Sequence, residues 1–259
     1  MKVDKSVENY QARYQQYVDF ERIIDGEYAL IAEVLAARIN ARFSSGNVRF
    51  LDVGCGTGRM MQYLLPLLSV DPSVDYLDPS PEALELYREN VPADQLNQGI
   101  ASDWSSLTTQ SHYDIILANN ALCGFDCTDY QAVRQFQKRL HPGGITLLTL
   151  PSKRGDWVSY GEKYWEEVHG AAFEKTVFED ITRSCDSLGI PHADEFVQAP
   201  VSLLGDRTGI LETVFSVMMF VDRNQIGEKY TPMFSRFEHD VTGDTLEFVY
   251  GVASITNDN

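Results

Sequence analysis

The chain has 259 residues with a formal net charge of −17, and 44% of its residues are apolar. This length fits a single α/β domain with additions, and no apolar run is long enough to span a bilayer. A surface this negative repels phosphate backbones, so nucleic acid is a poor candidate partner and a cationic small molecule is favoured.

Four cysteines without a Cys-x-x-Cys pair predict neither a metal site nor a disulfide framework. The polar, charged beginning of the sequence predicts a cytoplasmic protein without a membrane segment. The oligomeric state is open, and a monomer is compatible with the sequence.

Residues 4–44 carry apolar and aromatic side chains, Tyr10 among them, at spacings of three to four residues. This spacing predicts two helices with a break near Asp25-Gly26. Carboxylates such as Glu21 surround the break, where they are either solvated charges or groups that contact a substrate. We expect residues 1–44 to form a helical cap.

Residues 50–60 predict a buried strand, a glycine-rich turn and the start of a helix. Gly54, Gly56 and Gly58 remove side chains from the turn, so the backbone can approach a ligand. The N–H groups that begin the following helix would face that ligand. The alternative is a tight turn that binds nothing.

The next two predicted strands each end on an acid. Residues 74–78 end on Asp78, which lies about 20 residues beyond the turn, where a doubly wound fold places a carboxylate for ribose hydroxyls. Pro79-Ser80 then begin a helix, so a capping role for Asp78 is the alternative. Residues 98–104 end on Asp103 and Trp104, an acceptor and a ring that suit an adenine.

Strand and helix continue to alternate up to residue 150. A fourth strand over 113–120 ends on Asn119 and Asn120, above the crevice where such sheets bind ligands. A helix from about Thr128 to Leu140, closed by residues 141–144, precedes a fifth strand over 145–150. This alternation predicts a doubly wound parallel sheet.

The later part of the chain departs from this alternation. Trp157 and Trp165 lie in an aromatic segment after the fifth strand and either pack on the surface or form walls for a cationic or aromatic substrate. A helix over 178–188, a strand over 192–204, an apolar helix over 211–221 that includes Phe215, and a strand over 244–255 follow. The two late strands predict an antiparallel hairpin at a sheet edge.

The opening motif is similar to the first motif of the class I S-adenosylmethionine (SAM)-dependent methyltransferases. As it stands here, it reads Leu51-Asp52-Val53-Gly54-Cys55-Gly56-Thr57-Gly58. A nicotinamide fingerprint fits less well, because the third glycine comes one residue early. The resemblance implies a seven-stranded Rossmann-like sheet with the last strand antiparallel. It also implies one domain, with a core over 45–204 and 241–259 and a substrate-capping insertion over 205–240.

The same resemblance implies SAM as cofactor and S-adenosylhomocysteine (SAH) as product. Gly54 and Gly56 would pass under the methionine part, Asp78 would hold the ribose, and Asp103 with Trp104 would hold the adenine. The full set of expected cofactor-binding residues is Asp52, Gly54, Cys55, Gly56, Asp78, Pro79, Ser102, Asp103, Trp104 and Asn119.

The order of parts also resembles the histamine N-methyltransferase group. The shared parts are the Tyr-rich N-terminal helices, an acid-Pro-Ser after the second strand, a Gly-x-Trp segment after the fifth, a Phe/Met-rich insertion and a final Thr-Leu-x-Phe strand. The resemblance implies the catalytic residues Glu21, Asn120 and Asp244 and the substrate-binding residues Tyr17, Trp157, Trp165 and Phe215.

This sequence departs from that group at Asp244, which replaces an amide, and at Cys123 and Gly124, which replace two tyrosines. The added carboxylate is compatible with a different, more basic amine.

The expected reaction is in-line transfer of a methyl group to the nitrogen of a small amine, accelerated by alignment and by the exclusion of water. Glu21 or Asp244 would attract the cation and accept its proton. The alternatives are O-methylation of a carboxylate or hydroxyl metabolite and a non-catalytic SAM-binding protein. Strand four lacks an Asn-Pro-Pro-Tyr signature, which disfavours nucleobase or glutamine methylation.

Overall fold

The computed structural model describes residues 14–104, 106–107, 111–124, 131–173 and 175–258. The chain divides into two units. Unit 1 comprises Met1–Glu27, Pro151–Lys175 and Gln198–Val249, and unit 2 comprises Tyr28–Leu150, Thr176–Val197 and Tyr250–Asn259. Tyr10 and Thr128, which we expected in helices, lie outside the described residues.

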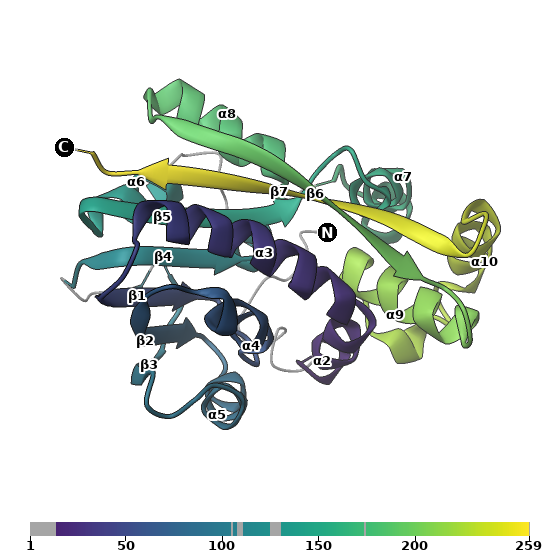
Figure 1. Ribbon diagram of the computed structural model, residues 1–259. Coiled ribbons are helices and arrows are strands. Elements are labelled where there is room, and N and C mark those ends of the chain that lie inside the picture. Colours follow the sequence, from purple (N-terminus) through teal and green to yellow (C-terminus); the bar gives the residue numbers. More distant parts are fainter. Residues whose placement is uncertain (1–13, 105, 108–110, 125–130, 174, 259) are drawn as a thin grey trace. The chain divides into compact units, whose positions relative to one another are not determined.

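The chain forms a seven-stranded sheet with the order β3-β2-β1-β4-β5-β7-β6 (Figure 1). Most of the sheet belongs to unit 2, whereas Pro151 of β5, residues 198–202 of β6 and residues 245–249 of β7 are assigned to unit 1. Pairing is parallel from β3 through β5, whereas the arrow of β7 points against those of β4 and β5 (Figure 1). The expected Rossmann-like sheet with an antiparallel last strand is therefore confirmed. The strands are β1 (Asn47–Val53), β2 (Asp71–Asp78), β3 (Leu96–Ala101), β4 (Tyr113–Asn119), β5 (Leu140–Pro151), β6 (His192–Ser202) and β7 (Thr245–Thr256).

The hydrophobic core of unit 2 lies between the sheet and its helices. Val133 and Phe136 of α6 and Phe178 and Ile181 of α8 are buried with Ile116 of β4 in one cluster. The α-helices of this unit are α3 (Asp25–Arg42, in unit 2 from Tyr28), α4 (Arg59–Leu64), α5 (Pro81–Asn90), α6 (Gln131–Lys138) and α8 (Phe178–Leu188). The 3-10 helices are η1 (Leu65–Leu67) and η2 (Ala121–Gly124).

Unit 1 is built on an aromatic core. Phe215 of α9 is fully buried, and its ring centroid lies 5.3–6.4 Å from those of Tyr164, Phe234 and Phe237. Helix α9 is apolar over most of its surface, as expected for a helix packed on several sides. The helices of this unit are α2 (Tyr14–Ile23), α7 (Asp156–His169), α9 (Arg207–Met219), η3 (Arg223–Gln225) and α10 (Thr231–Asp240).

Three details of the sequence prediction were wrong. The third strand ends at Ala101, so Asp103 and Trp104 follow it in a turn. Residues 141–144 belong to β5, because α6 ends at Lys138 and the strand begins two residues later, at Leu140. Helix α10 was not expected.

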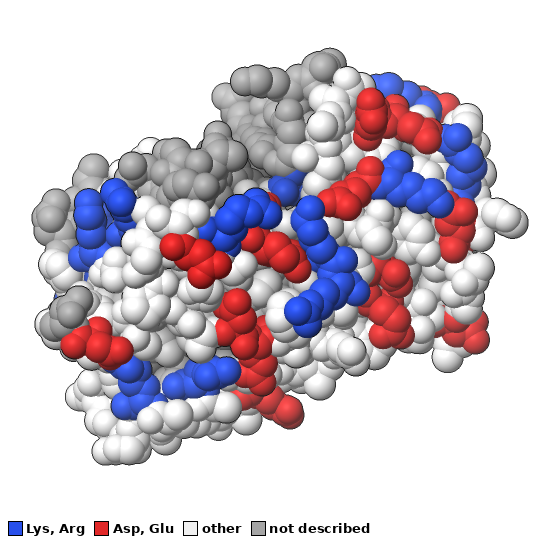
Figure 2. Space-filling model, turned by 90° about the horizontal axis from the view of Figure 1, so that it is seen from above, with Lys and Arg blue, Asp and Glu red and all other residues white. Residues whose placement is uncertain are grey.

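Charged side chains on the surface are interspersed by sign. Figure 2 shows Lys and Arg side chains adjacent to Asp and Glu side chains across the face in view. Many of them form ion pairs, for example Arg38 with Glu195 at 2.9 Å and Arg183 with Asp180 at 2.9 Å. None of the helices in the described part of the chain combines the length and apolarity needed to cross a bilayer.

Candidate cofactor-binding site

The candidate site lies at the carboxyl ends of the parallel strands of unit 2. Strands β1, β2 and β4 pair in parallel, so their last residues lie at one edge of the sheet. The backbone N–H groups of Gly54 and Cys55 both donate to the carbonyl of Leu77, at 2.8 and 3.0 Å. These bonds join the glycine-rich turn to the end of β2, directly beside Asp78.

Gly54 can only be a glycine in this structure. Its φ of 64° lies in the left-handed region, and a Cβ there would be 2.4 Å from the Cβ of Ala121. Ala121 lies two residues beyond the last residue of β4, so the missing side chain lets the turn after β1 approach the end of β4. The first glycine of the motif therefore serves close packing between two strand ends.

Asp78 is the most constrained acid of the site. Its side chain is buried, and its two oxygens accept the N–H groups of Gly56 at 3.1 Å and of Ser80 at 2.9 Å. Burial raises the pKa of Asp78 to about 6, although these two hydrogen bonds act in the opposite direction. A carboxylate has about four acceptor positions, and the described N–H groups use two, which leaves room for two hydroxyl donors.

Asp52 is a second buried acid, located beneath the turn. Tyr87 of α5 donates its hydroxyl to Asp52 at 3.0 Å. Burial raises the pKa of Asp52 to about 7, the Tyr87 hydrogen bond opposes the rise, and the charge of Asp78 adds to it. Tyr87 was not predicted as part of the site, although its position on the buried stripe of α5, after Ala83 and Leu84, was a usable signal.

Two asparagines form the part of the site contributed by β4. The hydroxyl of Thr149 on β5 donates to the side-chain oxygen of Asn119. The backbone N–H of Asn120 donates to the carbonyl of Thr149 at 3.0 Å, and Asn120 has a φ of 53°. A left-handed conformation outside glycine costs roughly 1 kcal/mol and is best tolerated by Asn and Asp. This bend turns the chain out of the sheet just beyond the strand end.

The segment after β3 carries Asp103 and Trp104, and the two side chains lie in different surroundings. Asp103 is half-buried and accepts the N–H of Ser106 at 2.8 Å, and Ser102 donates its hydroxyl to the carbonyl of Asp103 at 3.0 Å. Trp104 is 2% exposed. Its ring stacks on that of Phe136 with 4.4 Å between the ring centroids and lies under the guanidinium of Arg139. The Trp104 ring is therefore part of the core.

The remaining expected cofactor residues follow the strand ends. Cys55 is buried in the turn, and Pro79 is half-buried between Asp78 and the helix cap Ser80. No grouping of three or more His, Cys, Asp or Glu side chains suited to a metal ion occurs among the described residues.

The expected catalytic and substrate-binding residues are divided between the units. Asn120 belongs to unit 2, whereas Glu21, Tyr17 and Asp244 belong to unit 1. Glu21 and Tyr17 are half-buried on α2. Asp244 is exposed, and its carbonyl accepts the N–H of Leu203 at 2.8 Å.

Trp157 and Trp165, expected as walls for a cationic substrate, surround an ammonium group of the chain itself. The Nζ atom of Lys175 lies 5.3 Å from the Trp157 ring centroid, 5.7 Å from that of Trp165 and 3.7 Å from that of Phe220. It also donates to the carbonyl of Val217 at 3.2 Å, and Lys175 is 7% exposed. This arrangement was not predictable from sequence, because Lys175 lies ten residues beyond the aromatic segment.

Several known proteins with a similar sequence or fold are described as methyltransferases. A sequence profile described as "Methyltransferase domain" matches residues 51–146. The malonyl-[acyl-carrier protein] O-methyltransferase of Priestia megaterium is 23% identical over 165 residues, which cover 64% of this chain and 53% of that protein. This chain thus spans about half the length of its curated relative.

Solved structures extend the similarity to most of the chain. A structure described as a putative methyltransferase from Bacillus halodurans superposes with a TM-score of 0.60 at 16% identity, covering 87% of this chain and 98% of the other. The plantazolicin methyltransferase BpumL, solved with SAH, superposes with a TM-score of 0.55 at 15% identity, covering 94% of this chain and 89% of the other. The chain therefore has the class I SAM-dependent methyltransferase fold, and SAM is the cofactor that this fold implies.

Proposed function

We propose that this chain, which has the class I methyltransferase fold, transfers the methyl group of SAM to a small-molecule acceptor. The observation that carries the proposal is Asp78, a buried carboxylate fixed by two N–H groups at the end of β2 with acceptor positions left for two hydroxyls. A ribose offers such a pair of hydroxyls. The match of residues 51–146 to the methyltransferase profile supports the same proposal independently.

Residues at the strand ends would hold the cofactor. Asp78 would accept the ribose hydroxyls, the backbone of Gly54 and Gly56 would hold the methionine part, and Asp103 would accept from the adenine amine. SAM supplies a methyl group on a positively charged sulfur, and its leaving thioether is neutral. The chain therefore needs chiefly to align the acceptor and exclude water, with Asn120 orienting groups at the end of β4.

A small amine is the acceptor that the sequence favours. The net charge of −17 attracts cations, and Glu21 and Asp244 are candidate groups to accept the proton that the amine must lose before it attacks.

A carboxylate is the second candidate acceptor, and Lys175 favours it. The rings of Trp157 and Trp165 already have an ammonium group beside them, which opposes a second cation and attracts an anion. The curated relative is named as an O-methyltransferase of malonyl-[acyl-carrier protein], a name that agrees with this candidate. A hydroxyl acceptor remains within the same O-methylation proposal.

Incubation with methyl-labelled SAM and matched panels of small amines and small carboxylic acids separates these proposals. Labelled amines support N-methylation, and labelled esters support O-methylation. SAM binding without labelled product in either panel would instead identify a non-catalytic SAM-binding protein.

Lys175→Met tests the basis of the second candidate, with Lys163→Met as a control that removes an exposed lysine from the same unit. For a carboxylate acceptor, Lys175→Met should raise KM and Lys163→Met should leave it unchanged. For an amine acceptor, Lys175→Met should leave KM unchanged or lower it.

A further inference from the structure

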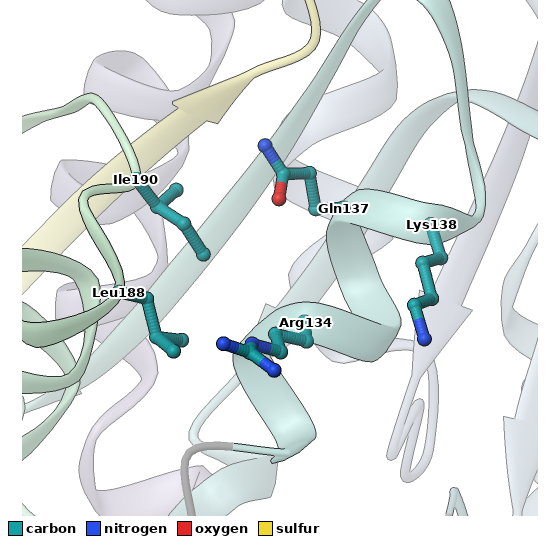
Figure 3. Close-up of a pocket in the computed structure, with 5 residues that line it drawn as sticks. All are labelled: Arg134, Gln137, Lys138, Leu188 and Ile190. Carbon is teal, nitrogen blue, oxygen red and sulfur yellow. The ribbon is translucent and has the colours of Figure 1, made fainter.

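A pocket of about 290 Å³ lies in unit 2, away from the strand ends described above. It is formed between the last turns of α6 and the end of α8 (Figure 3). Its lining residues are Arg134, Gln137, Lys138, Leu188 and Ile190. None of them belongs to the candidate cofactor site.

Helical spacing and a helix end bring these residues together. Arg134, Gln137 and Lys138 are three and four residues apart on α6, so they share one face of the helix, whereas Val133 and Phe136 are buried. On the other side, Gly189 adopts a φ of 64° and ends α8. The N–H of Ile190 then bonds to the carbonyl of Cys185 at 2.9 Å, which fixes the segment that carries the aliphatic wall.

The charge of this pocket is opposite to that of the chain. Among the described residues, its lining contains two cations and an amide but no carboxylate, in a chain with 38 acidic and 21 basic residues. Within the described ranges, Arg134 and Lys138 form no ion pair, whereas Arg183 on α8 pairs with Asp180 at 2.9 Å. Two uncompensated cations beside one pocket give it a locally positive potential.

We propose that this pocket binds a small anion with a carboxylate or phosphate head and a short aliphatic chain. Figure 3 shows the guanidinium of Arg134 directed toward Leu188, with Gln137 on the adjacent turn and Lys138 pointing away from the aliphatic side chains. A guanidinium matches two oxygens of either head group, and the Gln137 amide adds a further donor. Leu188 and Ile190 contact the aliphatic chain, and Lys138 contributes attraction at the mouth.

This inference is independent of the proposed methyltransferase activity, because it concerns binding alone. The volume of the pocket, about 290 Å³, is near the lower end of the range for small-molecule pockets. The site would therefore hold a short-chain acid or phosphate, and a methyl acceptor is not required there.

Amide chemical shifts of the full chain, followed by NMR during titration, test the proposal. The probes are butyrate, butyl phosphate, inorganic phosphate and uncharged 1-butanol, all at low salt. We expect saturable shifts at residues 188 and 190 with butyrate or butyl phosphate, weaker binding of inorganic phosphate and none of 1-butanol. The two butyl anions distinguish a carboxylate from a phosphate as the preferred head.

The variant Arg134→Met should weaken binding roughly tenfold, because it removes the two-oxygen contact while keeping an extended side chain. Arg183→Met, which removes an exposed arginine outside the pocket, should change affinity less than about twofold. Arg134→Lys keeps the charge but loses the planar fork, so an intermediate affinity is expected even if Arg134→Met folds poorly.

Equal losses of affinity at both arginines, or equal binding of inorganic and butyl phosphate, would show non-specific anion attraction and overturn the proposal. Absence of saturable shifts would overturn it too.

Discussion

Replacing Asp78 with Asn separates cofactor binding from folding. The substitution keeps the size of the side chain but removes its charge, and an amide nitrogen cannot accept the N–H of Gly56. A hydrogen bond to a charged group contributes about 1.5–3 kcal/mol, so weakening two ribose contacts should cost about 3 kcal/mol, or roughly 100-fold in the Kd for SAH. Isothermal titration calorimetry at a pH well above the raised pKa measures this loss.

The same substitution should not destabilise the free protein. Burial raises the pKa of Asp78 from 3.8 to about 6, so the buried charge opposes folding at neutral and higher pH by roughly 3 kcal/mol. Asn removes this charge while losing one hydrogen bond from Gly56. We therefore expect Asp78→Asn to bind SAH weakly yet unfold in urea at a denaturant concentration no lower than the original protein.

A matched control lies on the same strand. Asp75 is also buried on β2, but it accepts from Tyr113 at 2.9 Å and Asn97 at 2.5 Å, away from the turn. Asp75→Asn should lower stability and leave the Kd for SAH within about threefold, since it changes no group at the strand end. Retained affinity in Asp78→Asn, or equal losses in both variants, would refute the assignment of Asp78 to the ribose.

Four further results are expected. The affinity for SAH should fall as the pH is lowered through about 6, because a protonated Asp78 accepts fewer hydroxyl donors, and titrations of Asp78→Asn should lack this step. Over the same range the free protein should become more stable, because the native pKa exceeds the unfolded one and the buried charge is lost. Gly54→Ala should lower the free energy of unfolding in urea by about 1–3 kcal/mol more than Gly143→Ala. Gly143 also has a positive φ, but a Cβ added there would meet nothing within 4 Å. Trp104→Leu should lower the free energy of unfolding by roughly 2–4 kcal/mol, because its ring stacks on Phe136 in the core, and an unchanged urea midpoint would contradict that role.

The parts of the fold that were predictable from sequence depend on neighbouring residues. The strand-turn-helix at residues 50–60 was confirmed because glycines at alternate positions and an apolar run act locally. The position of Asp78 at the end of a strand followed from the same regularity, with Pro79 and Ser80 marking the helix start. The parallel pairing of β1 through β5 followed from the alternation of strands with helices, whereas the order of the strands in the sheet was not predicted.

The parts that were not predictable depend on contacts distant in sequence. The Trp104 ring packs on Phe136 rather than remaining in a strand, because a helix some thirty residues later covers it. Lys175 lies beside Trp157 and Trp165 only once the chain between them has folded. Helix α10 is short, and its aromatic residues are used in packing against α7 and α9, which its local pattern does not indicate.

A crystal structure of the protein with bound SAH would show whether Asp78 binds the ribose. We predict both ribose hydroxyls within about 3.2 Å of the Asp78 carboxylate oxygens, with the adenine beside Asp103 and the homocysteine part against the Gly54–Gly56 backbone. SAH bound elsewhere, or with its ribose out of reach of Asp78, would contradict this prediction.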